Sequence, residues 1–89
     1  MSENDETLLE FPCDFPIKAM GKAGIDLETT VVAIVRRHAP DLNEGAVQVR
    51  ESRGGNYLSI TVTVRATSRE QLDDIYRDLT ACEQVVMAL

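Results

Sequence analysis

The sequence predicts an α+β domain in which one antiparallel sheet is covered on one face by two helices. Three observations lead to this prediction. Residues 57–66 alternate strictly between apolar and polar side chains, which is typical of a strand with one buried face. Two stretches, one after Asp26 and one after Thr67, carry apolar residues at helical spacing. The elements follow one another as strand, helix, strand, strand, helix, strand, which a two-layer sandwich accommodates.

The composition and charge of the chain limit the classes of function that it can have. The chain has 89 residues, 44% of them apolar, and a formal net charge of −6, so one acidic domain is expected. Nucleic-acid binding relies on Lys and Arg neutralising phosphates, and an acidic domain is poorly suited to it. The sequence holds no apolar run of about 18 residues, the length of a membrane-spanning helix. The N-terminal residues are acidic where a signal peptide is basic, and we expect a cytoplasmic protein.

The N-terminal part is expected to pass from a tail into the first strand. Residues 1–7 are polar and acidic and predict a disordered tail, and residues 8–89 are expected to form the single folded domain. An apolar hook follows the tail at Leu8, Leu9 and Phe11. The first strand is expected over residues 15–22, where the apolar side chains that alternate are Phe15, Ile17 and Ala19.

A loop with two glycines joins the first strand to the first helix. Glycine permits a positive φ or the close approach of another segment. Two interpretations are open: a simple strand-to-helix turn, or a loop that contacts a ligand where a helix N-terminus favours an anion such as a small carboxylate. The residues of this candidate ligand-binding site are Gly21, Lys22, Gly24 and Asp26.

The first helix is expected to begin after Asp26, which suits an N-cap, and to end before Pro40. Its apolar stripe consists of Leu27, Val31, Ile34, Val35 and His38. His38 is the only histidine. We interpret it as a structural residue at a helix end, because no second metal ligand or nucleophile is evident.

The middle of the chain predicts a hairpin. Residues 46–52 alternate and form the second expected strand. Residues 53–56, Arg-Gly-Gly-Asn, have the composition of a tight turn that needs positive φ. The turn leads into the central strand over residues 57–66.

The second helix has a capping box at its start. Thr67 with Glu70 fits this motif, and Ser68 with Gln71 is an equally good frame. The apolar stripe that follows consists of Leu72, Ile75, Tyr76 and Leu79. Residues 80–83 are expected to connect to a last strand over 85–89. That strand is apolar throughout, so we expect it to be well covered or to lie near residues 8–11.

Right-handed crossovers between these elements give a ferredoxin-like βαββαβ arrangement with sheet order 4-1-3-2. This topology brings residues 21–26, 54–56 and 80–83 to one end of the domain. Cys13 then lies at the opposite end from Cys82, and we expect no disulfide within the monomer. Two isolated cysteines also provide neither a zinc site nor a CxxC redox motif.

The second face of the sheet is expected to remain uncovered, because no element is left to pack on it. Its side chains should be Lys18, Met20, Gln48, Arg50, Ser59, Thr61, Thr63 and Arg65. Two interpretations are open: a solvated face, or a docking face for a partner or a second copy. The candidate partner-binding residues are Lys18, Arg50, Thr61 and Arg65.

A set of short motifs in fixed order resembles a known family. These motifs are Leu8-Leu9-Glu10-Phe11-Pro12, Lys18-x-Met20-Gly21, Arg37-His38-Ala39-Pro40, Gly55-Asn56-Tyr57 with the Ser/Thr-alternating strand, and Val86-Met87-x-Leu89. Together they are similar to the small YbeD-type proteins of bacteria. The resemblance implies a ferredoxin-like fold similar to ACT regulatory domains, whose effectors bind near the glycine-containing loop after strand one, here residues 21–24. It also implies a loose link to lipoate metabolism, and it supplies no catalytic residues.

The function expected from these observations is that of a non-enzymatic regulatory or interaction domain. The sequence offers no nucleophile–base pair, carboxylate dyad, metal-ligand set or cofactor motif. The first hypothesis is an ACT-like sensor of a small carboxylate, and the alternative is a protein-binding adaptor that uses the uncovered sheet face. RNA binding is disfavoured, because Ser59, Thr61 and Thr63 stand where stacking aromatics are needed. A monomer or a weak homodimer is expected.

Overall fold

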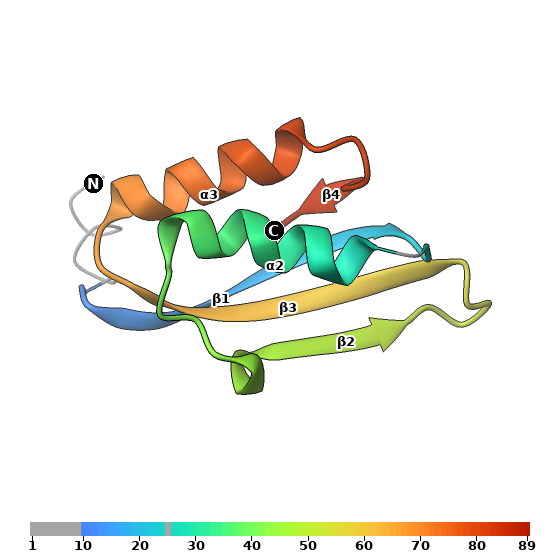
Figure 1. Cartoon of the computed structure of the whole chain (residues 1–89), viewed down its shortest axis with the longest axis horizontal. Coiled ribbons are helices and arrows are strands. Elements are labelled where there is room, and N and C mark those ends of the chain that lie inside the picture. Colours follow the sequence, from blue (N-terminus) through green and yellow to red (C-terminus); the bar gives the residue numbers. More distant parts are fainter. Residues whose placement is uncertain (1–9, 25) are drawn as a thin grey trace, which may run out of the picture.

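The computed structural model describes residues 10–24 and 26–89, which form a four-stranded antiparallel sheet with two helices on one face (Figure 1). The elements are β1 Cys13–Lys22, α2 Leu27–His38, a short 3-10 turn η1 Glu44–Ala46, β2 Val47–Glu51, β3 Tyr57–Ala66, α3 Arg69–Ala81 and β4 Met87–Ala88. The sheet order β2-β3-β1-β4 is the predicted order 4-1-3-2 read from the other edge. The predicted ferredoxin-like arrangement is confirmed.

The long strands β1 and β3 form the centre of the sheet. They pair from Cys13 opposite Ala66 to Lys22 opposite Tyr57, and β2 then pairs with the other side of β3. Alternate residues of β3 point toward the helices, and Ile60, Val62 and Val64 are fully buried. In the turn between β2 and β3, Gly55 has φ 76°, as its glycine-rich sequence predicts.

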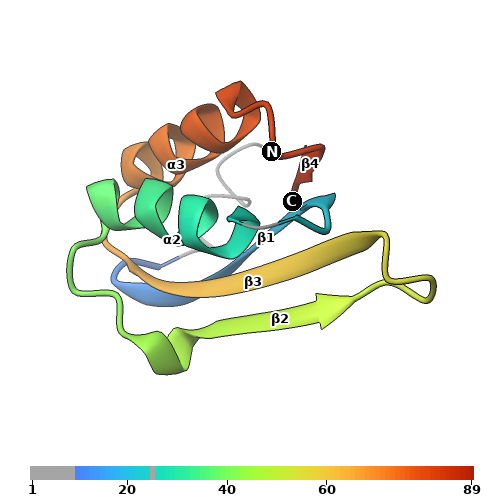
Figure 2. The ribbon, with the colours of Figure 1, turned by 45° about the vertical axis from the view of Figure 1, so that its right-hand side comes forward.

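The core lies between the sheet and the two helices. The helices contribute their predicted apolar stripes, and both pack on the same side of the sheet (Figure 2). Among residues 10–24 and 26–89, every side chain classed as buried is apolar. The opposite side of the sheet carries no element of the described chain.

The bounds of the two helices agree well with the prediction, but the N-cap hydrogen bonds differ from the predicted Asp26 cap and from the Thr67–Glu70 capping box. Asp26 occupies the N-cap position of α2 without making a side-chain cap hydrogen bond. The cap of α3 is Ser68, whose Oγ accepts a hydrogen bond from the Gln71 N–H at 3.0 Å. The Gln71 Oε1 in turn accepts from the Thr67 N–H at 2.7 Å. The second frame, Ser68 with Gln71, is therefore the one adopted, and Thr67 with Glu70 is wrong.

The start of β1 and the end of α3 depart from the prediction. β1 begins at Cys13, two positions before the expected start, because Cys13 still pairs with Ala66. α3 continues to Ala81, and its last turn holds Thr80, whose Oγ1 donates to the Tyr76 C=O at 2.9 Å. The expected tail over residues 1–7 and the hook residues Leu8 and Leu9 lie outside the described residues.

The last strand shows the largest departure. It was expected over residues 85–89, but only Met87–Ala88 form a strand, at the edge beside β1. Of the two alternatives for this strand, good coverage is wrong, because Val86, Met87 and Leu89 are 66%, 48% and 60% exposed. The other alternative, a position near residues 8–11, falls partly outside the described residues. Val85 alone is buried, because it lies at the close of the turn that follows α3, where its N–H donates to the Cys82 C=O.

Candidate functional site

The uncovered face of the sheet is organised in rows that cross the strands. Partners in an antiparallel ladder point to the same face, so the pairing fixes these rows. One row consists of Arg50, Ser59, Met20 and Met87. The next consists of Gln48, Thr61, Lys18 and Leu89, in which Lys18 and Leu89 exchange backbone hydrogen bonds of 3.0 and 2.8 Å. The two rows place cations, hydroxyls and exposed apolar side chains next to one another.

A shallow hollow of about 500 Å³ lies across these two rows. Its lining residues are Lys18, Gln48, Val49, Arg50, Ser59 and Thr61. Within the described part of the chain, neither Lys18 nor Arg50 has an ion-pair partner. The structure therefore brings together three of the four candidate partner-binding residues, namely Lys18, Arg50 and Thr61.

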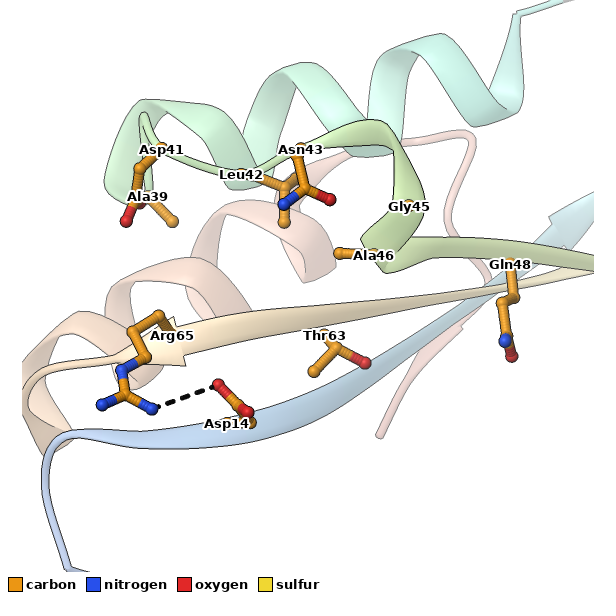
Figure 3. Close-up of a pocket in the computed structure, with 10 residues that line it drawn as sticks. All are labelled: Asp14, Ala39, Asp41, Leu42, Asn43, Gly45, Ala46, Gln48, Thr63 and Arg65. Carbon is orange, nitrogen blue, oxygen red and sulfur yellow. Dashed lines mark hydrogen bonds and ion pairs between the residues drawn. The ribbon is translucent and has the colours of Figure 1, made fainter.

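The fourth residue, Arg65, lies apart from the others. Its Nη1 is 3.5 Å from the Asp14 Oδ1, directly across the β1–β3 ladder, and both side chains are exposed. The pair lines a second hollow of about 630 Å³ beneath the connection between α2 and β2 (Figure 3). Arg65 thus has an exposed carboxylate partner of its own, and we separate it from the site formed around Lys18 and Arg50.

The second hollow exists because β2 is shorter than β3. β2 begins at Val47, opposite Val62, so the last residues of β3 extend past it. The connection over residues 39–46 lies above this gap, with Leu42 and Asn43 over Thr63 (Figure 3). Hydrogen bonds from the Arg36 guanidinium to the Leu42 C=O, at 3.1 and 3.3 Å, hold the connection in place.

The candidate ligand-binding loop has a clear packing role. Gly21 is buried, and a Cβ at this position would collide with the backbone carbonyl oxygen of Gln84. The Ala23 N–H donates to the Asn56 C=O at 2.8 Å. These contacts bring the loop beside the β2–β3 turn and the segment before β4, as the topology predicts. Glycine is needed at position 21 because the backbone of Gln84 approaches it closely.

The remaining residues of that loop face solvent. Lys22, Gly24 and Asp26 are exposed, and Ile25 lies outside the described residues. None of the candidate ligand-binding residues lines either of the two hollows described above. A ligand-binding role for Gly21, Lys22, Gly24 and Asp26 stays a prediction.

His38 joins the two helices. Its Nε2 lies 2.7 Å from the Asp78 Oδ2, and the Arg37 Nη1 lies 3.7 Å from the same oxygen. The hydrogen bond from His38 lowers the pKa of Asp78, and the nearby charges of His38, Arg37 and Arg77 lower it further. The Gln71 Nε2 also donates to the His38 C=O at 2.7 Å. This network agrees with a structural role for the histidine.

Sequence reasoning missed Asp78 and Gln71 as partners of His38. The available signal was their spacing: seven residues, or two helical turns, separate them on α3, so both lie on the side that faces α2.

No group of three or more His, Cys, Asp or Glu side chains suited to hold a metal ion occurs in residues 10–24 and 26–89. Cys13 and Cys82 are both free thiols. No described helix is both long and apolar enough to span a membrane.

Fold and surface together define a small ferredoxin-like α+β domain with one uncovered, cation-bearing sheet face. Comparison with known proteins agrees with this class and gives the family. A family model described as "Protein of unknown function (DUF493)" matches residues 6–89. The chain belongs to this family.

Relatives and a solved structure support the assignment. Proteins named UPF0250 protein from Paraburkholderia phytofirmans and Chromobacterium violaceum are 54% and 52% identical to this chain over 89 residues, with full coverage of both chains. These are the YbeD-type proteins that the motifs resemble. The solution structure of protein HP0495 from H. pylori has a TM-score of 0.70 over 91% of this chain and 85% of that chain. At 12% identity this likeness shows the fold alone.

Proposed function

We propose that this protein is a non-enzymatic interaction domain that binds an acidic segment of a partner protein on the uncovered face of its sheet. The observation that carries the proposal is the hollow lined by Lys18 and Arg50, two cations without ion-pair partners among the described residues. The whole chain has 15 acidic residues against 9 Lys and Arg. Two cations gathered in one hollow therefore make it locally basic on an acidic chain.

The chemistry of the hollow suits carboxylates. An arginine guanidinium binds a carboxylate through two parallel hydrogen bonds, and a lysine ammonium acts as a point charge. The neighbouring Ser59, Thr61 and Gln48 side chains supply further donors. Lys18 and Arg50 are two strands apart and lie in adjacent rows, so they are roughly 12 Å apart on the sheet. Acidic side chains about four residues apart on an extended segment point to the same face and can therefore reach both cations.

An apolar flank adjoins the two cations. Met20 and Met87 continue the row of Arg50, and Leu89 continues the row of Lys18. Methionine side chains adapt to irregular partner surfaces. We expect the preferred partner segment to carry an apolar residue next to its acidic ones. The two free cysteines support a cytoplasmic setting for this interaction.

The test is an amide NMR titration with a hexaglutamate peptide at low ionic strength. The site variant is K18E/R50E, and the matched control is R53E/R69E, which changes the net charge equally at exposed arginines away from the face. We expect the site variant to weaken binding by about tenfold or more, which corresponds to about 1.4 kcal/mol. The control should stay within about threefold of the wild type. Equal weakening by both variants would show a net-charge effect and reject the site.

A second candidate function is an ACT-like sensor of a small carboxylate. The observation that favours it is the start of α2, where Asp26 makes no side-chain cap and the adjoining Gly24 is exposed. The family resemblance to ACT domains and the loose link to lipoate metabolism suggest amino acids, lipoate and octanoate as ligands. Titration with these compounds should shift amides of residues 21–26 and 54–56, and Gly24→Val should abolish the shifts. A spectrum that does not change would exclude these ligands.

A further inference from the structure

We propose that the free edge of β2 pairs with the same edge of a second copy of this chain, joining two sheets into one continuous sheet. The inference stands on the backbone geometry of β2 and is independent of the proposed function. In the described part of the chain, β2 has β3 as its one neighbour and forms an edge of the sheet.

The hydrogen-bonding direction of each β2 residue follows from the turn. The Ser52 N–H donates to the Tyr57 C=O at 2.8 Å, so Ser52 points its backbone groups toward β3. Backbone groups alternate along a strand. Arg50 and Gln48 therefore also bond toward β3, and Val47, Val49 and Glu51 point outward. The Val47 N–H is used within η1, where it donates to the Glu44 C=O. The backbone groups that face outward are the N–H and C=O of Val49, the N–H and C=O of Glu51, and the C=O of Val47.

The β2 edge is less protected against strand addition than the β4 edge. Edge strands are commonly blocked by proline, a bulge, charged side chains or extreme shortness. β2 carries the charged residues Arg50 and Glu51, but it contains no proline or bulge over Val47–Glu51, and its outward-facing centre is Val49, a β-branched residue that is 43% exposed. The opposite edge is different. β4 has only two residues, and Pro16 takes the place of a donor on the side of β1 where β4 pairs.

Two copies of β2 can pair about a two-fold axis at Gln48, Val49 or Arg50. The charges of the side chains and the length of β2 favour the axis at Val49. With the two-fold axis at Val49, the two Val49 residues exchange hydrogen bonds, and each Glu51 N–H donates to the C=O of the partner's Val47. Gln48 then lies opposite the partner's Arg50. An axis at Arg50 would place two arginines directly opposite each other, which is unfavourable. An axis at Gln48 would leave Glu51 without a strand partner, because it would face the η1 turn.

The pair should have an unusual salt dependence. Each copy carries a formal net charge of −6, so two copies repel each other at long range. Added salt screens this repulsion and should strengthen the pair. Binding of an acidic peptide at Lys18 and Arg50 should respond in the opposite direction. The two interactions can therefore be told apart in one salt series.

The test uses the full chain at about millimolar concentration in an equal mixture of isotope-labelled and unlabelled protein. An intermolecular Hα–Hα contact is expected between Gln48 and the partner's Arg50, because a non-hydrogen-bonded pair has its Cα atoms about 4.5 Å apart. Within one chain the same two residues are roughly 6.6 Å apart along the strand. Sedimentation equilibrium should show a dimer that strengthens between low and moderate salt.

Variants at the axis complete the test. Val49→Lys places like charges opposite each other, and Val49→Pro removes the outward donor without touching the β2–β3 ladder. Each should raise the dimer dissociation constant by about tenfold or more, and the control Val49→Thr should change it by less than about threefold. Lys18→Gln changes a residue of β1, away from the β2 edge, and should retain the dimer while it weakens peptide binding, so this result and the peptide result can fail separately. A wild-type monomer at millimolar concentration, or a dimer that lacks the contact or survives both disruptive variants, would overturn the proposal.

Discussion

The two faces of the sheet are built from alternate residues of the same strands, yet only one of them is buried. On β3, Ile60, Val62 and Val64 are fully buried beneath the helices. Their neighbours Ser59, Thr61 and Thr63 lie on the uncovered face and remain partly accessible. The covered face is constrained by packing, whereas the other face can vary its chemistry at little cost to folding. Lys18 and Arg50, which have no ion-pair partner among residues 10–24 and 26–89, occur on the face that is not needed for the core.

The largest expected effect is a cavity on the covered face. Ile60→Ala removes a fully buried side chain at the centre of the sheet and should lower the free energy of unfolding by about 2–5 kcal/mol. Its neighbour on the other face provides the control: Thr61→Ala should cost less than about 1 kcal/mol. Urea unfolding of both variants measures the difference. Similar losses at the two positions would contradict the division between the faces.

The next effect concerns the two glycines of the loop after β1. Gly21→Ala should destabilise the protein by about 1–3 kcal/mol, because its Cβ meets the Gln84 backbone. Gly24→Ala should be neutral or stabilising by up to about 1 kcal/mol, because the site is open and its φ is not positive. Thermal unfolding of the two variants measures the difference in their stability. Equal destabilisation would mean that the loop needs glycine for a reason other than this approach.

A pH-dependent effect is expected within the helical layer on the covered face. The folded-state pKa of Asp78 is lowered from its usual value of 3.8, chiefly by the hydrogen bond to His38. A lowered carboxyl pKa contributes stability above the unfolded value and loses it as the pH falls through the folded value. The difference in unfolding free energy between the wild type and Asp78→Asn should therefore shrink below about pH 4.

Asp74→Asn serves as the control for this measurement. Asp74 pairs with Arg77 on α3 itself, at 3.0 Å, and makes no ion pair or side-chain hydrogen bond with α2 in the described structure. We expect its acid response to follow the wild type. A constant difference between wild type and Asp78→Asn from neutral to acidic pH would contradict the assigned role of the His38 bond.

The smallest expected effect belongs to the uncovered face. The Asp14–Arg65 pair is exposed on both sides, and exposed pairs contribute about 0–1 kcal/mol. Asp14→Asn should therefore change the free energy of unfolding by less than about 1 kcal/mol, and salt should erase the change. Chemical unfolding at low and high ionic strength tests this. A loss comparable to that of Ile60→Ala would show that the uncovered face also determines stability.

Most of the fold could be predicted because its signals are local and agree with one another. The alternation of 57–66 fixed β3, and the stripe from Leu27 ended by Pro40 fixed α2. Helix caps were less certain, because two legal frames overlap at Thr67 and Ser68. The adopted frame also makes a tertiary contact, because the Gln71 Nε2 donates to the His38 C=O. No local sequence pattern predicts this contact.

The outer parts of the fold and the site were harder to predict. The apolar run 85–89 predicted a strand that is covered or lies near residues 8–11, but coverage depends on what packs there, and in the described structure β4 pairs with β1 and packs mainly against α3. The face of each strand residue was predictable from alternation, so Lys18, Arg50 and Thr61 were grouped correctly. The isolation of Arg65 depends on the length of β2 and on its pairing with Asp14, and both are set by the folded structure.

The most direct test of the central claim is the affinity of hexaglutamate for K18E/R50E compared with R53E/R69E, measured by amide shifts at low salt. We expect wild-type shifts to cluster at the residues lining the hollow around Lys18 and Arg50. We expect this binding to be lost in K18E/R50E and kept in R53E/R69E. Equal binding by the two charge-matched variants, or shifts confined to residues 21–26, would contradict the claim that the uncovered sheet face is the binding surface.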